Sequence, residues 1–220
     1  MGLLAIVAHL CLKPSPAPAQ TPISCPKFKE FSKSFSQEKI LWQSLTTGVE
    51  SVLNKKPPTP SIFLLAYNDH RTSEVLMRNI INATAECMKS SNPILLDGRT
   101  FVSKKMLEDY GEIIETYREQ LERNGIMYVS DLNKTPAQAA QAFHSICDTV
   151  TPLVQRAVIY FTVQVDQSDL NLPPVQLLKL VENKLSDEWR REATVSENTL
   201  KALITRVTDQ VLLLRADPKI

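Results

Sequence analysis

Residues 61–76, "SIFLLAYNDHRTSEVL", join a continuous apolar run to a helical pattern through a short polar segment. An apolar run that leads directly into a helix is typical of a buried strand in a parallel sheet and of the crossover that follows it. Many α/β proteins hold a nucleotide at the turn between these two elements. The polar segment here contains neither glycine nor lysine. The stretch therefore predicts the strand–turn–helix unit of a nucleotide-binding fold without the residues that normally bind phosphate.

The rest of the chain continues this alternation of strands and helices. Apolar runs at residues 62–66, 93–96, 126–129 and 157–165 are each followed by a helical pattern. The expected helices are bounded by capping or breaking residues: Ser36 and the prolines of "KKPPTP", Ser103 and Asn124-Gly125, Thr135-Pro136, Pro173-Pro174, and Ser196. Strands that alternate with helices imply parallel strands joined by crossovers. We therefore predict an α/β fold built on a parallel sheet.

One folded domain is expected, because 220 residues with 43% hydrophobic side chains suffice for one ordinary core. The net charge is +1, so the chain has no broad basic surface for phosphates and nucleic acid is not an expected partner. Proline, serine and lysine are frequent after the first residues, and no sustained apolar period is visible there. The predicted organisation is an apolar leader at residues 1–12, a flexible linker at 13–35 and a folded domain at 36–220.

The apolar leader and two glycosylation sequons indicate the cellular compartment of the chain. Residues 2–12, "GLLAIVAHLCL", are too few to span a bilayer, which takes about 20 residues. They fit either a signal-peptide core or the end of a transmembrane helix that begins upstream of Met1. Both alternatives carry the rest of the chain across a membrane. The acceptor sequons at Asn82 and Asn133 fit glycosylation on that side.

The cysteines allow at most one internal disulfide. Cys11 belongs to the leader, which leaves Cys25, Cys87 and Cys147. Helices after the first and third strands can lie on opposite faces of a parallel sheet, which argues against a bond between Cys87 and Cys147. The pairing stays open at this stage. The sequence shows no C-x-x-C motif or Cys/His cluster, so we expect neither a metal nor another cofactor.

The turn after the first strand lacks the features of a phosphate cradle. Such a cradle needs glycines, so that backbone N–H groups can converge on the anion, and a lysine for the terminal phosphates. Here Tyr67 and His70 are bulky, Asp69 would repel a phosphate, and Arg71 is a single cation. Asp131 follows the third strand where a magnesium-binding carboxylate would lie, but we interpret it as a turn residue because no cradle accompanies it. We therefore predict no nucleotide binding.

Other catalytic patterns are also missing from the sequence. There is no G-x-S-x-G, H-E-x-x-H or glycine-rich dinucleotide motif. His144 and Cys147 lie three residues apart on one predicted helix and could touch. Cys147 stands among Phe143 and Ile146, so we interpret it as a core residue or half of a disulfide. The chain is not expected to be an enzyme.

Several segments together resemble a known family. In chain order they are "ILWQS…VLNKK", "PSIFLLAY", "NPILLDGRT", "GIMYVSDL", "AVIYFTVQVD" and a last predicted helix "LITRVTDQVLLL". This order resembles the luminal domain shared by lamina-associated polypeptide 1 and its luminal-domain-like, torsin-binding relative, over residues 36–214. The most specific elements are Leu41-Trp42, the turn Asp97-Gly98-Arg99-Thr100, and the helix that carries Arg206.

The resemblance implies a degenerate AAA+-like (P-loop NTPase-like) domain that binds no nucleotide. It further implies a single-pass membrane protein that faces the endoplasmic reticulum lumen or the perinuclear space, beside a torsin ATPase. The family supplies an arginine finger to the torsin active site, where a guanidinium offsets charge in the phosphoryl-transfer transition state. By motif match, that arginine is Arg206. A luminal or secreted adaptor without activating role and an unrecognised enzyme remain alternative functions.

Arg206 also satisfies a simple geometric requirement for this role. At 100° per residue it falls roughly 120° from the centre of the apolar stripe of its predicted helix. This stripe consists of Leu200, Leu203, Ile204, Val207 and Val211. An arginine at that angle flanks the buried face, so it can be presented to a partner. Without the resemblance it would be a solvated helix residue; Arg190, Arg191 and Arg215 are the alternative arginines.

Overall fold

The computed structural model describes residues 21–166, 169, 171–192 and 194–220. In this part of the chain, five strands form one sheet in which every pair is parallel. The strands are β1 (Ser61–Tyr67), β2 (Ile94–Asp97), β3 (Ile126–Ser130), β4 (Val158–Gln164) and β5 (Val211–Leu214). Their order across the sheet is β2-β3-β4-β1-β5, with β1 between β4 and β5. The predicted α/β fold with a parallel sheet is confirmed.

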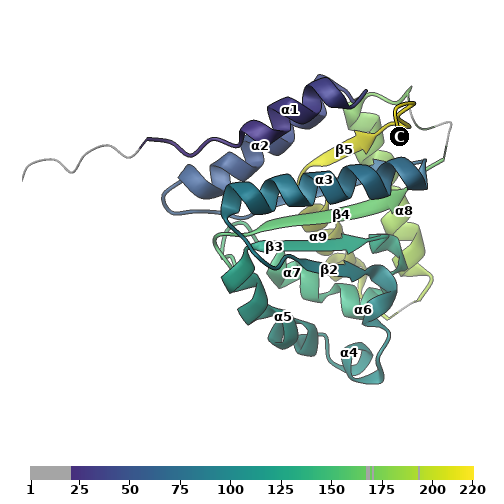
Figure 1. Cartoon of the computed structure of the whole chain (residues 1–220). Coiled ribbons are helices and arrows are strands. Elements are labelled where there is room, and N and C mark those ends of the chain that lie inside the picture. The colour runs from purple at the N-terminus through teal and green to yellow at the C-terminus, as the bar shows by residue number, and fades with distance from the viewer. Residues whose placement is uncertain (1–20, 167–168, 170, 193) are drawn as a thin grey trace, which may run out of the picture.

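Helices cover both faces of the sheet (Figure 1). One face carries α1 (Pro26–Ser34), α2 (Lys39–Asn54) and α3 (His70–Met88). The other carries α4 (Lys104–Glu108), α5 (Gly111–Asn124), α6 (Ala137–Ala140), α7 (Ala142–Ile146), α8 (Pro174–Arg190) and α9 (Glu197–Val207). Short 3-10 turns, η1 (Gly98–Phe101) and η2 (Leu132–Lys134), follow β2 and β3. Each central strand is therefore buried on both sides, which explains its continuous apolar sequence.

Alternation along β1 divides the core into two layers. Ile62 and Leu64 point into the larger layer, against α5 to α9. Phe63 and Leu65 point into the smaller layer, against α1 to α3. The carboxyl ends of the parallel strands meet at one edge of the sheet, which is where ligands bind in open α/β folds.

The segment predicted as a linker is helical at its end, so the prediction is wrong for residues 26–34. Phe28, Phe31 and Phe35 recur at helical spacing, and Phe28 is completely buried. The rings of Phe31 and Phe35 lie 6.0 and 6.2 Å from the ring of Trp42 on α2. Because polar residues separate these phenylalanines, the apolar period was not recognised in the sequence. Residues 1–20, which include the predicted leader and the first part of the predicted linker, lie outside the described residues.

A disulfide ties the start of α1 to the end of α3. Cys25 is bonded to Cys87, and Cys147 is a buried free thiol. The argument against a bond between Cys87 and Cys147 is confirmed, because α3 and α7 cover opposite faces of the sheet. The start of α1 is therefore covalently fixed to the end of α3.

The predicted C-terminal helix ends earlier than its sequence suggested. Helix α9 stops at Val207, and residues 211–214 form β5, which pairs with β1. The prediction of a helix through "VLLL" is wrong, and Val211 belongs to a strand and not to the apolar stripe of α9. A four-residue run of β-branched and aliphatic residues fits either a helix or a strand. Here the hydrogen bonds to the edge of β1 favour the strand.

The predicted helix boundaries hold in part. Ser103 and Ser196 cap α4 and α9, and Gly125 ends α5 with φ +69°. The helix expected to run on from Ser103 is divided, because the Asp109 carboxylate accepts the Gly111 N–H and starts α5 anew. The N-caps expected at Ser36 and Thr135 are wrong: Glu38 precedes α2 and Pro136 precedes α6.

Candidate functional site

The first turn of α3 already carries a carboxylate where a phosphate would bind. Asp69 is the N-cap of the helix, and its Oδ2 accepts the N–H of Thr72 at 2.7 Å. The hydrogen bonds from Thr72 lower the pKa of this carboxyl, so it is ionised at neutral pH. A phosphate at this helix terminus would have to displace an anion of the same chain. The turn after β1 is thus the capped N-terminus of α3.

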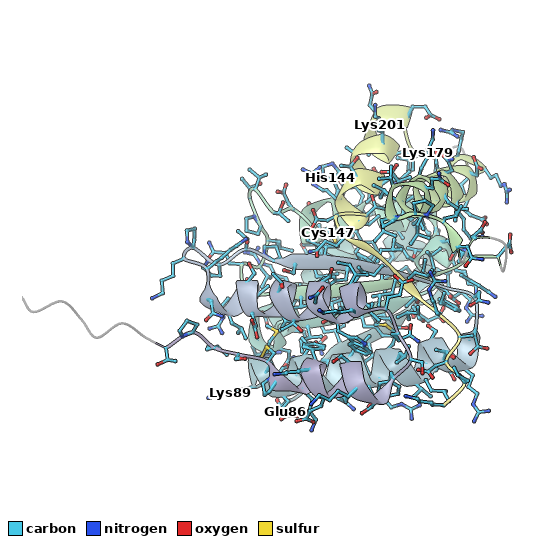
Figure 2. All side chains as sticks on the ribbon, turned by 90° about the horizontal axis from the view of Figure 1, so that it is seen from above. Glu86, Lys89, His144, Cys147, Lys179 and Lys201 are labelled. Atoms are coloured by element: carbon cyan, nitrogen blue, oxygen red, sulfur yellow. A yellow bond between two sulfur atoms is a disulfide. The ribbon has the colours of Figure 1, made fainter. Side chains whose placement is uncertain are left out.

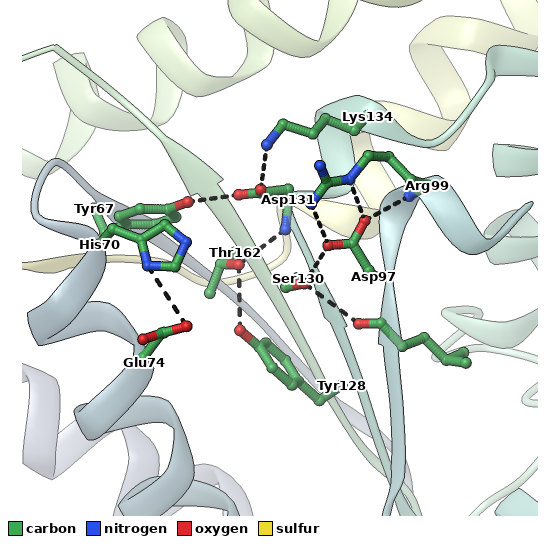
Figure 3. Close-up of polar contacts among 11 residues, drawn as sticks. Tyr67, His70, Glu74, Asp97, Arg99, Tyr128, Ser130, Asp131, Lys134 and Thr162 are labelled. Atoms are coloured by element: carbon green, nitrogen blue, oxygen red, sulfur yellow. Dashed lines mark hydrogen bonds and ion pairs between the residues drawn. The ribbon is translucent and has the colours of Figure 1, made fainter.

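A buried polar cluster occupies the carboxyl edge of the sheet (Figure 3). Asp131, which follows β3, is 5% exposed and adopts a left-handed backbone conformation with φ 49°. Its carboxylate accepts the hydroxyl of Tyr67 at 2.6 Å and the ammonium of Lys134, while its N–H donates to Thr162 Oγ1 at 3.0 Å. The interpretation of Asp131 as a turn residue was therefore incomplete. The side chain also joins the ends of β1, β3 and β4.

The Asp97-Gly98 turn packs against this cluster. Arg99 donates to both oxygens of Asp97 at 2.8 and 2.9 Å, and Ser130 Oγ donates to the same carboxylate at 3.3 Å. A Cβ atom on Gly98 would lie 2.4 Å from the carbonyl oxygen of Asp131. Glycine is required here because two backbones approach closely. The predicted turn is present, and it anchors β2 to β3.

A cavity of about 510 Å³ lies between this cluster and α3. Helix α3 contributes His70, Glu74 and Arg78 to its wall, and the sheet contributes Tyr128 and Leu95. The side chain of Leu95 is exposed, at 61% for the residue, where no helix covers β2 on this face in Figure 1. Acidic, basic and aromatic side chains all line the cavity, so its wall carries charges of both signs.

Three titratable groups beside the cavity, Tyr128, Tyr67 and Asp97, have pKa values shifted away from the neutral range. Burial raises the pKa of Tyr128 to about 12. Burial, together with the hydrogen bond to Asp131, raises the pKa of Tyr67 still further. The hydrogen bond from Arg99 lowers the pKa of Asp97 well below its usual range. General acid–base catalysis favours groups that titrate near the working pH, so these three groups are unsuited to it. Their hydrogen bonds instead link the ends of different strands.

We expect Tyr67→Phe to lower the free energy of unfolding by about 1–3 kcal/mol, because it leaves a buried carboxylate one donor short. Tyr128→Phe is the matched control: its hydroxyl lies 3.5 Å from Thr162 Oγ1, a much weaker contact. Urea unfolding of both variants measures the difference. Equal losses in the two variants would contradict the role of Asp131 in linking the ends of β1, β3 and β4.

Arg206 lies at the opposite, amino edge of the sheet. It occupies the last turn of α9, and its side chain is 30% exposed. Nη2 donates to Asp148 Oδ2 at 3.0 Å, and Nη1 lies 3.2 Å from His144 Nε2. Figure 2 shows His144 and Cys147 next to α9, away from Glu86 and Lys89 at the end of α3. The predicted site residue is therefore partly exposed and held by two neighbours.

The two neighbours of Arg206 have fixed charge states at neutral pH. Burial and the positive charge of Arg206 lower the pKa of His144, so the imidazole is neutral and can accept a hydrogen bond. Hydrogen bonds from the Thr151 N–H and from Arg206 lower the pKa of Asp148. The guanidinium thus has one anionic and one neutral acceptor. His144 contacts Arg206, and the nearby Cys147 is buried with a raised pKa, as expected of a core thiol.

The alternative arginines all form ion pairs, which are exposed for Arg190 and Arg191 and partly exposed for Arg215. Arg190 pairs with Glu197, and Arg191 pairs with Glu188. Arg215, beyond β5, pairs with Glu38 at the start of α2. Such pairs contribute little to stability.

The two sequons lie in different surroundings. Asn82 is exposed on α3 and borders the cavity, while Thr84 of the same sequon is buried and bonded to Tyr160. Asn133 lies in η2 with a buried Oδ1, and Thr135 is 1% exposed. The structure thus makes Asn82 the more accessible acceptor.

No metal site is formed by three or more His, Cys, Asp or Glu side chains in the described part of the chain. The same residues contain no helix that is long and apolar enough to cross a membrane.

Comparisons with known proteins assign no family to this chain. No protein-family model matches it. The chain is similar to a segment of the Replicase polyprotein 1ab of Alphamesonivirus 1, with 26% identity over 179 residues, which is 79% of this chain and 3% of the polyprotein. Among solved structures it is similar to a DNA polymerase III gamma subunit-related protein from Thermotoga maritima, with 15% identity and a TM-score of 0.35; the match covers 75% of this chain and 59% of that chain. Both likenesses are too weak to define what the chain does.

Proposed function

We propose that this chain is a luminal activator of a torsin-type AAA+ ATPase that supplies Arg206 to the active site of its partner. The observation that carries the proposal is the state of Arg206. Its guanidinium is partly exposed and oriented by Asp148 and His144 at one edge of an AAA+-like domain. An arginine that acts on another subunit must reach the surface and must hold its direction.

The turn after β1 supports a non-catalytic role. The Asp69 carboxylate occupies the start of α3, and no glycine or lysine is available in residues 67–73. We propose that the domain binds no nucleotide of its own and that hydrolysis takes place in the partner. The same fold then serves as a neighbour in a mixed assembly, where its edge faces the partner's nucleotide.

The disulfide supports the proposed compartment. Bonds such as Cys25–Cys87 form and persist in the endoplasmic reticulum lumen and are rare in the cytosol. An accessible Asn82 fits glycosylation there. We therefore propose that the chain faces the endoplasmic reticulum lumen or the perinuclear space, attached to the membrane through its N-terminal segment.

The proposal is tested by measuring phosphate release. The purified domain is titrated into a torsin ATPase with ATP and magnesium, and we expect a saturable rise in the rate. The domain alone, at the same ATP concentration, is the control and should release no phosphate. Binding without a rise in rate would contradict activation and favour the adaptor function. Phosphate release by the domain alone would contradict the non-enzymatic role.

A further inference from the structure

Asp148 joins the surface loop after α7 to Arg206. Its Oδ1 accepts the N–H groups of Val150 and Thr151 at 2.8 and 2.9 Å. Its Oδ2 accepts Nη2 of Arg206 at 3.0 Å. One ionised carboxylate therefore fixes both the backbone of the loop and the direction of the guanidinium. The side chain of Asp148 is only 15% exposed, so these bonds are partly shielded from water.

The loop carries an apolar side chain that the domain leaves in solvent. Val150 is 86% exposed, the highest value among the exposed large hydrophobic residues in the described part of the chain. A single exposed valine is ordinary on a protein surface. This one, however, is held in place by the carboxylate that also holds Arg206. A subunit that receives the arginine would meet Val150 at the same time.

Asp148 and His144 leave part of the guanidinium available. The group has five N–H donors, and these two neighbours engage one from each terminal nitrogen. An arginine without such neighbours would lose much more side-chain freedom on reaching a phosphate. Preorganised charges are the more effective ones in catalysis, because no reorganisation is needed as the reaction proceeds.

We infer that Asp148 is the positioning residue of Arg206, and that it also presents Val150 as a contact for the same ATPase subunit. This inference rests on the proposed function and adds two residues to it. Asp148 acts through Arg206 and does not itself touch the nucleotide. The inference predicts that the two carboxylate oxygens have separable effects. The bond from Arg206 to Oδ2 sets the rate of ATP hydrolysis in the assembled complex, and the bonds from the loop to Oδ1 set the affinity of the domain for the ATPase.

The test uses three variants of the whole domain in the phosphate-release titration. Asp148→Asn keeps an Oδ1 acceptor for the loop but presents an amide to Arg206; we expect the maximal stimulation to fall about tenfold with little change in half-saturating concentration. Val150→Asp should do the reverse, raising the half-saturating concentration about tenfold while the maximum is retained. Asp148→Glu keeps the charge but shifts it away from the loop, so it should resemble Val150→Asp.

Separate outcomes distinguish this inference from the proposed function. If the parent domain gives no stimulation, the proposed function fails and the inference with it. If the parent stimulates but Asp148→Asn matches or exceeds it, Asp148 does not position the arginine, and the inference alone is overturned. Thermal melting identifies a variant that has lost its fold. In that case Asp148→Glu decides, because a fall in its maximum at unchanged half-saturation would also overturn the inference.

Discussion

Replacing Arg206 by alanine is expected to remove the stimulation of the partner ATPase completely. An arginine finger contributes about 10³–10⁵ in rate in related phosphoryl transfers, so the residual rate should be that of the ATPase alone. Arg206→Lys should also fail, although it keeps the charge, because an ammonium cannot fork onto two phosphate oxygens. Single-turnover phosphate release measures both effects. The loss should appear in the catalytic rate, since the transition state is what the guanidinium stabilises.

The complex with Arg206→Ala should still form, because the substitution removes one partly exposed side chain and leaves the core intact. Arg215→Ala is the matched control: this arginine is also partly exposed and also ion-paired, to Glu38, and should stimulate normally. Equal losses in the two variants would show that positive charge in general, and not this arginine, is required. Full stimulation by Arg206→Ala would contradict the assignment.

Removing the Cys25–Cys87 disulfide is expected to cost about 4 kcal/mol of unfolding free energy. The bond joins positions separated by 62 residues, so in the chain-entropy model it restricts a large part of the unfolded chain. It also holds α1 against α2 and α3, where Phe28 is buried. Cys87→Ser should therefore lower the denaturant midpoint and loosen the segment before α2.

Reduction of the parent protein is the matched control for this substitution. With a reducing agent, the parent should unfold at the same denaturant concentration as Cys87→Ser, and the variant itself should not respond. Cys25→Ser should give the same loss, and the double variant should lose no more than either single one. Additive losses would contradict a bond between these two cysteines.

The sequence predicted the parts of the fold that depend on local pattern. The strands β1 and β4 are continuous apolar runs because they are buried on both faces, and such runs are visible without any structure. Helix α1 was missed because its apolar period consists of two phenylalanines, with Phe35 directly after the helix, among lysines and serines. Strand β5 was missed because "VLLL" becomes a strand only through its pairing with β1.

The neighbours of the candidate site residues could not be predicted. Arg206 was selected by resemblance to a family, but Asp148 and His144 precede it by 58 and 62 residues, and no local spacing connects them. The bond between Tyr67 and Asp131 crosses 64 residues for the same reason. Tyr67 and Asp131 meet because the parallel strands bring their ends together, and Arg206 meets its neighbours because α9 packs beside α7. The order of the strands and helices has to be known first.

The most direct measurement is a structure of the domain bound to a torsin ATPase that carries ADP with aluminium fluoride, a mimic of the transferring phosphate. The account predicts the guanidinium of Arg206 at about 3 Å from the mimic, with Asp148 still bonded to it from the other side. A complex in which Arg206 points away from the partner's nucleotide, with another residue or none in its place, would contradict the central claim.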